Sequence, residues 1–188
     1  MRLIVAITGA SGVTYGKRLL EVLRSKNVET HLVISQAAER IIEHELDITK
    51  KDVENLATYV YEVNNWNSPI VSGSFKTEGM VIIPCSMKTL AGITHGYSDN
   101  VILRAADVTL KEKRKLILVP REAPLNAIHL RNMLELAEND VCIAPAMPAY
   151  YHKPKRIEDL VEFVVGKVLD ILGIEHTLYK RWQEIQTP

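Results

Sequence analysis

The sequence predicts a three-layer α/β fold in which helices cover both faces of a doubly wound parallel sheet of the Rossmann or flavodoxin type. Apolar runs of strand length alternate with helix-like stretches along the chain. The strand-like runs are continuously apolar, which is typical of parallel strands that are buried on both faces. The chain has 188 residues, 47% of them hydrophobic, so we expect one compact domain spanning residues 1–188.

The expected elements follow one another in β–α order. Strand-like runs occupy residues 3–8, 30–35, 80–85, 115–119 and 140–144, and helical periodicity marks residues 17–25, 37–44, 88–93, 101–113, 125–137 and 157–172. The right-handed crossover rule then gives the doubly wound arrangement. Segments 64–77 and 146–155 break the alternation, and long loops in such folds lie at the carboxyl ends of strands, where ligands bind.

The last expected helix is apolar on more than one face. Its apolar residues are Leu160, Val161, Phe163, Val164, Val165, Val168, Leu169, Ile171 and Leu172. A helix on the surface of a monomer shows a single apolar stripe. This helix is therefore either deeply buried or part of a subunit interface, and both interpretations stay open.

Composition and charge exclude several classes of function. The charges of the 23 basic and 23 acidic residues cancel, so the net charge favours neither nucleic-acid binding nor attraction to a membrane surface. No apolar run approaches the roughly 20 residues that span a bilayer, and no signal-peptide cleavage site follows Arg2, so we expect a cytoplasmic protein. The two cysteines, Cys85 and Cys142, each end an apolar run and are expected to be buried free thiols in a reducing compartment.

A glycine turn follows the first strand and reads Thr8-Gly9-Ala10-Ser11-Gly12. Glycine lets the backbone approach a ligand, and a helix N-terminus attracts an anion, so the turn suits a nucleotide phosphate or a flavin. The spacing excludes a P-loop, because Ser11 stands five residues before Gly16, and it excludes a dinucleotide fingerprint. Ser11 is expected to be exposed at the end of the strand, with a simple helix-capping role as the alternative.

A short-chain dehydrogenase is excluded by a different count. Tyr151 and Lys155 have the spacing of the catalytic pair of those enzymes, but the pair must lie one helical turn apart. Pro154 stands between them and would break the helix, so the match is accidental.

Hydroxyl side chains end two further strands. Ser35 ends the second strand, and the run Cys85-Ser86-Met87-Lys88-Thr89 ends the third and opens a helix with hydroxyls and a lysine. Each hydroxyl alone is typical of a helix cap. Together with Ser11, they favour one extended polar ligand, such as a ribityl phosphate, at one edge of the sheet.

A group of charged residues adds a second part to this site. Arg104 and Lys111 are seven residues apart on one expected helix and so share a face, where the alternative is a solvated face with a surface ion pair. Arg121 and Glu122 follow the strand at 115–119, and the loop at 148–154 supplies two tyrosines and positive charge. A basic pocket with a tyrosine and a carboxylate suits a phosphorylated substrate and its departing phosphate.

These residues strongly resemble the UbiX flavin prenyltransferases, from the first strand to Arg181-Trp182. The matching motifs are Gly9-Ala10-Ser11-Gly12, Trp66 with Ser72-Gly73-Ser74, Pro84-Cys85-Ser86-Met87-Lys88-Thr89, Arg104-Ala105-Ala106-Asp107-Val108 with Leu110-Lys111-Glu112, Val119-Pro120-Arg121-Glu122-Ala123-Pro124 and Tyr150-Tyr151-His152-Lys153-Pro154. The resemblance places the fold in the flavin-containing cysteine decarboxylase superfamily. Older descriptions call such proteins aromatic-acid or 3-polyprenyl-4-hydroxybenzoate decarboxylases.

The resemblance implies that the protein joins a dimethylallyl group from dimethylallyl phosphate to N5 and C6 of reduced FMN. The product, prenylated FMN, would pass to a UbiD-type decarboxylase in ubiquinone synthesis or aromatic-acid breakdown. The family also implies a large homo-oligomer, a dodecamer, which agrees with the apolar last helix.

The resemblance also assigns roles to residues. It implies that FMN is bound by Gly9, Ala10, Ser11, Ser35, Ser86, Met87, Lys88, Thr89 and Arg121. It implies that the prenyl phosphate is surrounded by Arg104, Lys111, Glu122, Tyr151 and Lys167. Lys167 stands where an arginine or a lysine is expected, so the charge is kept but a bidentate geometry is not. Glu45 lies in a Glu-x-Asp stretch that is often found after Ser35, and it is counted with the catalytic residues Ser11 and Trp66.

The expected chemistry needs no metal. The chain has no Asp-Asp-x-x-Asp cluster, so it lacks the carboxylates that hold Mg²⁺ in ordinary diphosphate-using prenyltransferases. Fixed cations and a proton donor must then assist a monophosphate to leave. We expect Arg104, Lys111 and Lys167 to hold the phosphate and Glu122 to supply or relay the proton. Trp66 would face the developing allyl cation, a contact worth about 0.5–2 kcal/mol.

Two other functions compete with this interpretation. A phosphopantothenoylcysteine-type decarboxylase also uses FMN, but its late strand ends in Pro-x-Met-Asn, whereas this chain has Pro145-Ala146-Met147-Pro148. Proline cannot make the contact of that asparagine with a substrate carboxylate. The other candidate, a non-enzymatic flavodoxin-like carrier, would have no use for Arg104, Lys111 and Tyr151.

Overall fold

The computed structural model describes residues 1–182, and the chain divides into two compact units, Met1–Pro145 and a second that begins at Ala146. The expectation of a single domain stays a prediction. The strands of the first unit are β1 (Arg2–Ile7), β2 (Glu29–Ile34), β3 (Tyr59–Tyr61), β4 (Gly79–Cys85), β5 (Lys115–Pro120) and β6 (Cys142–Ile143). Its helices are α1 (Val13–Ser25), α2 (Gln36–Leu46), α3 (Lys50–Glu54), the 3₁₀ helix η1 (Pro69–Val71), α4 (Met87–Thr94), α5 (Val101–Lys111) and α6 (Ala127–Glu138).

The six strands form one parallel sheet in the order β3-β2-β1-β4-β5-β6. The chain first builds outward from β1 to β3 and then returns to place β4 on the other side of β1. This is the Rossmann strand order, with its switch point between β1 and β4. The predicted fold class is therefore confirmed.

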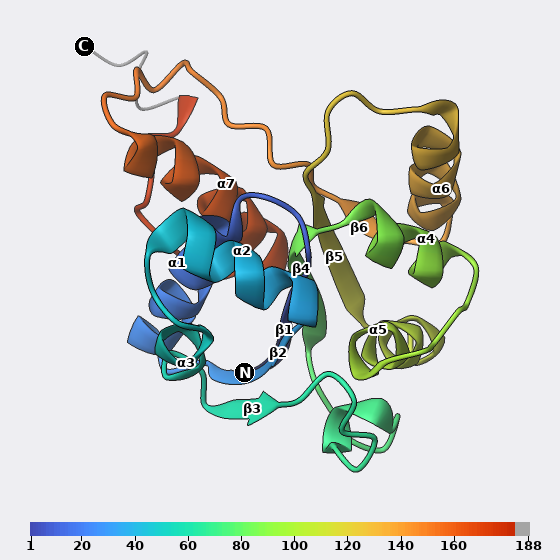
Figure 1. The fold of residues 1–188 in the computed structure, drawn as a ribbon. Coiled ribbons are helices and arrows are strands. Elements are labelled where there is room, and N and C mark those ends of the chain that lie inside the picture. Colours follow the sequence, from blue (N-terminus) through green and yellow to red (C-terminus); the bar gives the residue numbers. More distant parts are fainter. Residues whose placement is uncertain (183–188) are drawn as a thin grey trace. The chain divides into compact units, whose positions relative to one another are not determined.

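Helices cover both faces of the sheet (Figure 1). On one face α1 packs on β1, β2 and β4, and α2 packs on α1. On the other face α5 packs on β4 and β5, while α4 contacts α5 and α6. Because both faces are covered, the four strands β1, β2, β4 and β5 contribute buried side chains in succession, as their apolar runs predict.

The thiols follow the prediction only in part. Cys85 is fully buried, and burial raises the pKa of its thiol well above the ordinary value. Cys142 is also a free thiol, but it is only partly buried. The expectation that both thiols are buried is therefore wrong for Cys142, because β6 is a two-residue strand at the edge of the sheet.

Three short elements were not predicted from the sequence: α3, β3 and η1. The strand β3 pairs with β2 but is largely exposed, so its residues lack the apolar run of a central strand. Its position is fixed by His31 of β2, which is 2% exposed and lies stacked on Tyr59 and Tyr61. His31 Nδ1 also lies 2.9 Å from the Tyr61 hydroxyl, so a long-range contact, not a local pattern, defines this edge.

The second unit is built on α7 (Ile157–Leu172), whose bounds match the predicted helix. Side chains on more than one face of α7 are buried, including Phe163, Val164 and Val165. Deep burial, one of the two interpretations of the apolar pattern, accounts for them. Across residues 1–182, no helix is long and apolar enough to cross a membrane.

Candidate active site

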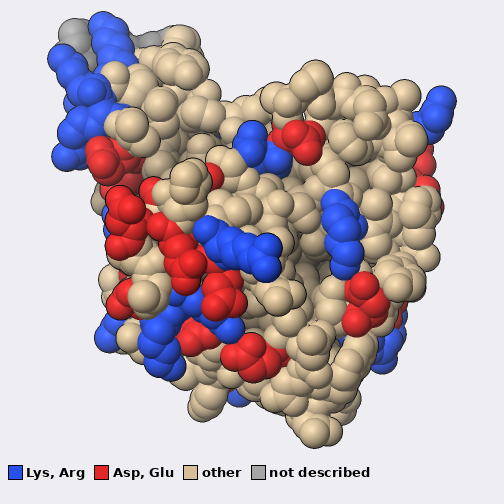
Figure 2. All heavy atoms as spheres, in the orientation of Figure 1, with Lys and Arg blue, Asp and Glu red and all other residues tan. Residues whose placement is uncertain are grey.

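A cavity of about 480 Å³ lies at the switch point of the sheet, where the carboxyl ends of β1 and β4 meet. Its size falls in the range of ligand pockets, roughly 300–1,000 Å³. Five segments of the first unit supply its walls: Gly9, Ala10, Ser11, Ser35, Ala37, Ser86, Met87, Lys88, Thr89, Asn100, Ile102, Arg121 and Glu122. Figure 2 shows Lys and Arg side chains spaced around the middle of one face, with acidic residues gathered over α2 and α3.

Every residue that was expected to bind FMN lines this cavity. The turn after β1 supplies three of them, the start of α2 supplies Ser35, the start of α4 supplies four, and Arg121 follows β5. Glu122, expected at the prenyl phosphate, lines the same cavity. The prediction that hydroxyl-bearing strand ends converge therefore agrees with the geometry, while ligand binding by these residues stays a prediction.

The glycine turn is shaped by two glycines with different roles. Gly12 has φ +97°, in the left-handed region that favours glycine. A Cβ at Gly9 would lie 2.6 Å from the Cβ of Ala37, so only glycine lets α2 come this close to the turn. The two glycines thus bring Ser11 and the start of α2 to the same cavity.

Thr8 ties this turn to the one after β4. Its side chain is 1% exposed, and its hydroxyl donates to the Pro84 carbonyl at 2.9 Å. The same hydroxyl accepts the Ser86 amide N–H at 2.8 Å. One buried hydroxyl therefore sets the spacing of the two walls that carry Ser11 and Ser86.

The N-termini of α2 and α4 open toward the cavity and are capped by serines. Ser35 caps α2 by accepting the Ala38 amide at 3.2 Å. Ser86 caps α4 by accepting the Thr89 amide at 3.3 Å. Both hydroxyls serve as caps and also line the cavity. The positive ends of two helix dipoles therefore face the position of a bound ligand, which favours an anionic group there.

The N-terminus of α1 is satisfied differently. Its N-cap is Gly12, with no side-chain cap, so the alternative that Ser11 is a helix cap is wrong. Instead the Glu45 carboxylate accepts the Gly12 amide at 2.9 Å and the Val13 amide at 3.2 Å. Within residues 1–182 the Ser11 hydroxyl has no hydrogen-bond partner, which leaves it available to a ligand in the cavity.

Arg121 and Glu122 form the wall after β5. Arg121 Nε donates to the Ser11 carbonyl at 3.2 Å, which fixes the guanidinium beside the glycine turn. Glu122 Oε1 accepts the Ala123 amide at 3.1 Å. Lys88 completes the charged rim and lies 3.3 Å from Asp99. The cavity thus combines two cations, a carboxylate and several hydroxyls.

Arg104 and Lys111 lie outside the lining of this cavity. Arg104 pairs with Asp107 at 2.5 Å and donates to the Val71 carbonyl at 3.2 Å, and Lys111 pairs with Glu112. The expected grouping of these two cations with Arg121 and Glu122 does not occur within one chain. The start of α5 does reach the cavity through Ile102, but a residue two positions later points about 200° around the helix.

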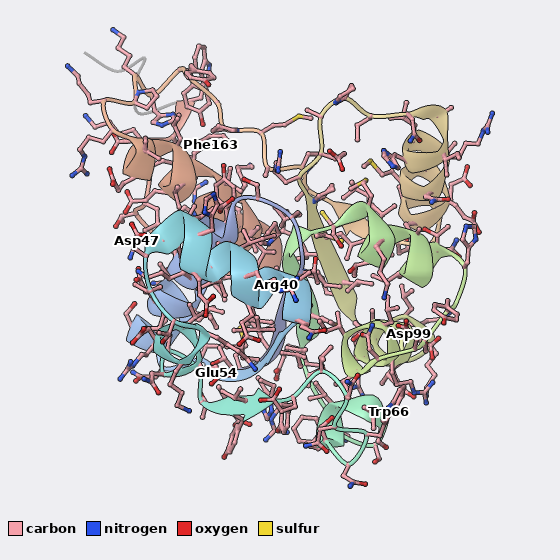
Figure 3. The ribbon with its side chains drawn as sticks, viewed as in Figure 1. Arg40, Asp47, Glu54, Trp66, Asp99 and Phe163 are labelled. Atoms are coloured by element: carbon pink, nitrogen blue, oxygen red, sulfur yellow. The ribbon has the colours of Figure 1, made fainter. Side chains whose placement is uncertain are left out.

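Trp66 also lies outside the lining, in the loop between β3 and η1 (Figure 3). Its side chain is 47% exposed. Two arginines anchor the segment that follows Trp66. Arg104 donates to the Val71 carbonyl, and Arg114 donates to the carbonyls of Gly73 and Phe75 at 2.7 Å. The Ser72-Gly73-Ser74 and Leu110-Lys111-Glu112 motifs are therefore neighbours in space, since Gly73 lies against Glu112.

Tyr151 and Lys167 belong to the second unit. Tyr151 packs edge-on against Phe163 of α7, at 5.8 Å between ring centroids (Figure 3 shows Phe163). Lys167 Nζ lies 3.7 Å from a carboxylate oxygen of Asp170. Within this unit Lys167 is thus part of α7, and Tyr151 packs against α7.

Sequence reasoning missed Ala37, Asn100 and Ile102 as lining residues. Asn100 had a readable signal, because an asparagine directly before an apolar helical run is a typical N-cap. Its side chain accepts the Leu103 amide at 3.0 Å. Ala37 carries no such signal, since only the close approach of Gly9 brings it to the cavity.

Comparisons with known proteins agree with this geometry. The model of the Flavoprotein family matches residues 1–169. The flavin prenyltransferase UbiX of Methanocaldococcus jannaschii is 54% identical over 182 residues, which cover 97% of this chain and 98% of that protein. A dodecameric FMN-dependent UbiX-like decarboxylase from Escherichia coli O157:H7 is 52% identical, with a TM-score of 0.96 over 97% of this chain and all of that chain.

A further solved structure carries ligands. AnUbiX (PadA1), solved in complex with FMN and dimethylallyl pyrophosphate, is 49% identical, with a TM-score of 0.95 over 96% of each chain. The peptidyl-cysteine decarboxylase EpiD is only 19% identical at a TM-score of 0.63, so it shares the fold alone. The UbiX relatives, in contrast, are about half identical to this chain over nearly its whole length. The chain therefore belongs to the UbiX family of flavin prenyltransferases.

Proposed function

We propose that this chain transfers the dimethylallyl group of dimethylallyl phosphate to N5 and C6 of reduced FMN, giving prenylated FMN. The observation that carries the proposal is the cavity at the switch point, where the motif residues of four strand ends converge. A relative of 49% identity binds FMN and a dimethylallyl ester in the same fold.

The chemistry of the lining fits FMN. Hydroxyls from Ser11, Ser35 and Ser86 match the polar ribityl chain, and the helix N-termini at Ser35 and Ser86 match its phosphate. Arg121 lies beside Ser11, so both would contact the flavin on its glycine-turn side. When bound, reduced FMN supplies the nucleophilic N5 and C6 of the reaction.

Glu122 is the proposed proton donor to the departing phosphate. It lines the cavity, and its Oε1 is oriented by the Ala123 amide. A phosphate monoester leaves poorly as a fully ionised group, so a positioned proton donor contributes about 10²–10⁴ in rate. Lys167 and Tyr151 of the second unit are the proposed ligands of that phosphate, and Trp66 the proposed partner of the allyl cation.

Arg104 and Lys111 act, in this proposal, in the site of a neighbouring copy of the chain. They lie outside the cavity of their own chain, and a relative of 52% identity is a dodecamer. The exposed apolar residues Ile128, Leu130 and Leu134 on α6 offer a surface for such assembly. Light scattering should then report a homo-oligomer, with twelve copies as the proposed number.

Mass spectrometry of the flavin tests the activity. Purified protein, reduced FMN and dimethylallyl phosphate should yield FMN enlarged by one five-carbon unit, and a parallel reaction with dimethylallyl pyrophosphate identifies the preferred donor. Glu122→Gln should lower kcat about 100-fold or more while the Kd for FMN stays within about twofold. Glu138→Gln, at the exposed end of α6, is the matched control. The proposal fails if the wild type adds no five-carbon unit.

Mixed oligomers test the role of Arg104. If Arg104 serves a neighbouring site, mixing the inactive variants Arg104→Ala and Glu122→Gln should restore part of the activity, because some sites then receive both native residues. No recovery after verified subunit exchange would place Arg104 elsewhere.

The product is the proposed cofactor of a UbiD-type decarboxylase, which would receive it from this enzyme. A reducing compartment, the cytoplasm, is the proposed location, since both cysteines are free thiols. Transfer is measurable as activation of an apo-decarboxylase by the reaction mixture.

A further inference from the structure

The second unit folds its last described segment back onto α7. After Gly173 ends the helix in a left-handed conformation, residues 174–182 return along it. A Cβ at Gly166 would lie 2.5 Å from the Tyr179 ring and 2.8 Å from the His176 ring, so glycine is required for this approach. The returning segment is therefore built to lie against α7.

Asp170 of α7 holds that segment with three of its side chains. Its carboxylate accepts the Tyr179 hydroxyl at 2.6 Å, Arg181 at 2.7 Å and His176 Nε2 at 3.2 Å. His176 Nδ1 accepts the Leu178 amide at 3.2 Å, so Nε2 is the ring nitrogen that faces Asp170. One carboxylate thus gathers three donors from within six residues of chain.

The charge state of this cluster is fixed. Partial burial raises the pKa of the Asp170 carboxyl, but hydrogen bonds from Arg181 and Tyr179 outweigh it and hold that pKa far below its ordinary value. Burial and the neighbouring Asp170 anion raise the pKa of the Tyr179 phenol. Asp170 is therefore an anion and Tyr179 a donor throughout the range in which the protein can be assayed.

The same cluster reaches the two proposed phosphate ligands. The Tyr179 ring packs on Phe163 at 4.8 Å, and Phe163 contacts Tyr151. Trp182, at the end of the segment, packs edge-on against Tyr151 at 5.3 Å. Tyr151 is thus held between α7 and the segment that Asp170 anchors.

Lys167 is oriented by Asp170 directly. Its Nζ lies 3.7 Å from Oδ2, close enough for an ion pair but beyond hydrogen-bond distance. The carboxylate already accepts closer donors, so the ammonium is oriented while its N–H groups stay available to a ligand.

We propose that Asp170 is a positioning residue for the substrate phosphate, fixing Lys167 through the ion pair and Tyr151 through the returning segment. This inference rests on the proposed function, in which Lys167 and Tyr151 bind that phosphate. The direction of the expected change in phosphate binding distinguishes positioning by Asp170 from a purely electrostatic effect of its charge. Removing the Asp170 charge would make the unit more positive and, by charge alone, strengthen phosphate binding. Loss of positioning would instead weaken phosphate binding.

The test is Asp170→Asn in the full-length protein, an almost isosteric change that removes the charge. At saturating reduced FMN, the KM for dimethylallyl phosphate should rise roughly tenfold or more, with kcat and the Kd for FMN within about threefold. Trypsin should cleave after Lys180 or Arg181 faster than in the wild type, because the segment is released. An unchanged or lower KM would overturn the proposal, as would a parallel loss of FMN binding.

Two further variants keep the test decisive. Asp159→Asn on the same helix removes a carboxylate that accepts the Lys155 and Arg156 amides, and it should lower stability without raising KM. If Asp170→Asn does not fold, Tyr179→Phe removes one donor and keeps the ring; KM should then rise about threefold, and no rise counts against the proposal. A wild type that prenylates no FMN refutes the proposed function, whereas equilibrium binding of dimethylallyl phosphate still tests the Asp170 link.

Discussion

Thr8 offers a quantitative test of how the cavity is held together. The change Thr8→Val keeps the shape and removes the hydroxyl that joins the turn after β1 to the turn after β4. The Pro84 carbonyl keeps the Thr8 amide as a donor at 3.2 Å, but the Ser86 amide loses its acceptor. A buried donor without a partner costs about 1–3 kcal/mol, and the added methyl group recovers part of this, so we expect a loss of about 1–2 kcal/mol in the free energy of unfolding.

The same change should weaken FMN binding, because the walls that carry Ser11 and Ser86 lose their fixed spacing. A loss of about 1 kcal/mol at the ligand corresponds to roughly a fivefold rise in Kd. Urea unfolding at fixed protein concentration measures the first effect as a lower midpoint at constant slope. Titration of flavin fluorescence measures the second.

Thr109→Val is the matched control. Thr109 is also 1% exposed, and its hydroxyl donates to the Ala105 carbonyl inside α5 at 2.7 Å. Removing that hydroxyl leaves no buried group without a hydrogen-bond partner, because the Ala105 carbonyl keeps its partner in the helix. We therefore expect the free energy of unfolding to change by no more than about 0.5 kcal/mol and FMN binding to stay the same. If the two variants lose stability equally, or if only Thr109→Val weakens FMN binding, the reasoning about Thr8 is wrong.

Two further predictions concern titratable groups of the first unit, Glu45 and His31. Glu45→Ala should lower the free energy of unfolding by about 1 kcal/mol, because the Gly12 and Val13 amides lose their carboxylate; unchanged urea unfolding would contradict this cap. Burial lowers the pKa of His31 below its ordinary 6.5, so the unfolded chain takes up a proton that the folded chain resists, and stability should fall as pH drops below about 6.5. His31→Asn should flatten this dependence in unfolding measured between pH 7 and 5; an equal slope in both proteins would remove His31 as the cause.

The sequence predicted the cavity well because its walls follow from one repeating rule. In a parallel sheet all strands end at the same edge, so hydroxyls at the ends of successive strands must converge. Ser11, Ser35 and Ser86 obey that rule, and Arg121 obeys it after β5. Each of these positions could be found from the end of an apolar run alone.

The position of Arg104 could not be predicted from the ends of strands, because Arg104 lies on a helix and a helix adds a second variable. A helical residue is placed by the rotation of the helix as well as by its position along the chain. Spacing correctly put Arg104 and Lys111 on one face, but it did not say toward which neighbour that face turns. The contacts of Arg104 with the Val71 carbonyl and of Lys111 with Gly73 show that this face turns toward the segment around η1, and neither cation lines the cavity.

Glu45 shows a different limit of prediction from sequence, which is the long-range contact. Its contact with the first amides of α1 changes the role expected of the glycine turn. A strand, a glycine turn and a helix normally present the helix N-terminus to a phosphate. Here the chain's own carboxylate, from the end of α2, accepts the first amides of α1, and no local pattern announces a contact across 33 residues. An anionic ligand group is therefore better served by the N-termini of α2 and α4, which open toward the cavity. The turn contributes instead through Ser11, whose hydroxyl has no partner within residues 1–182 and whose carbonyl holds Arg121 in place.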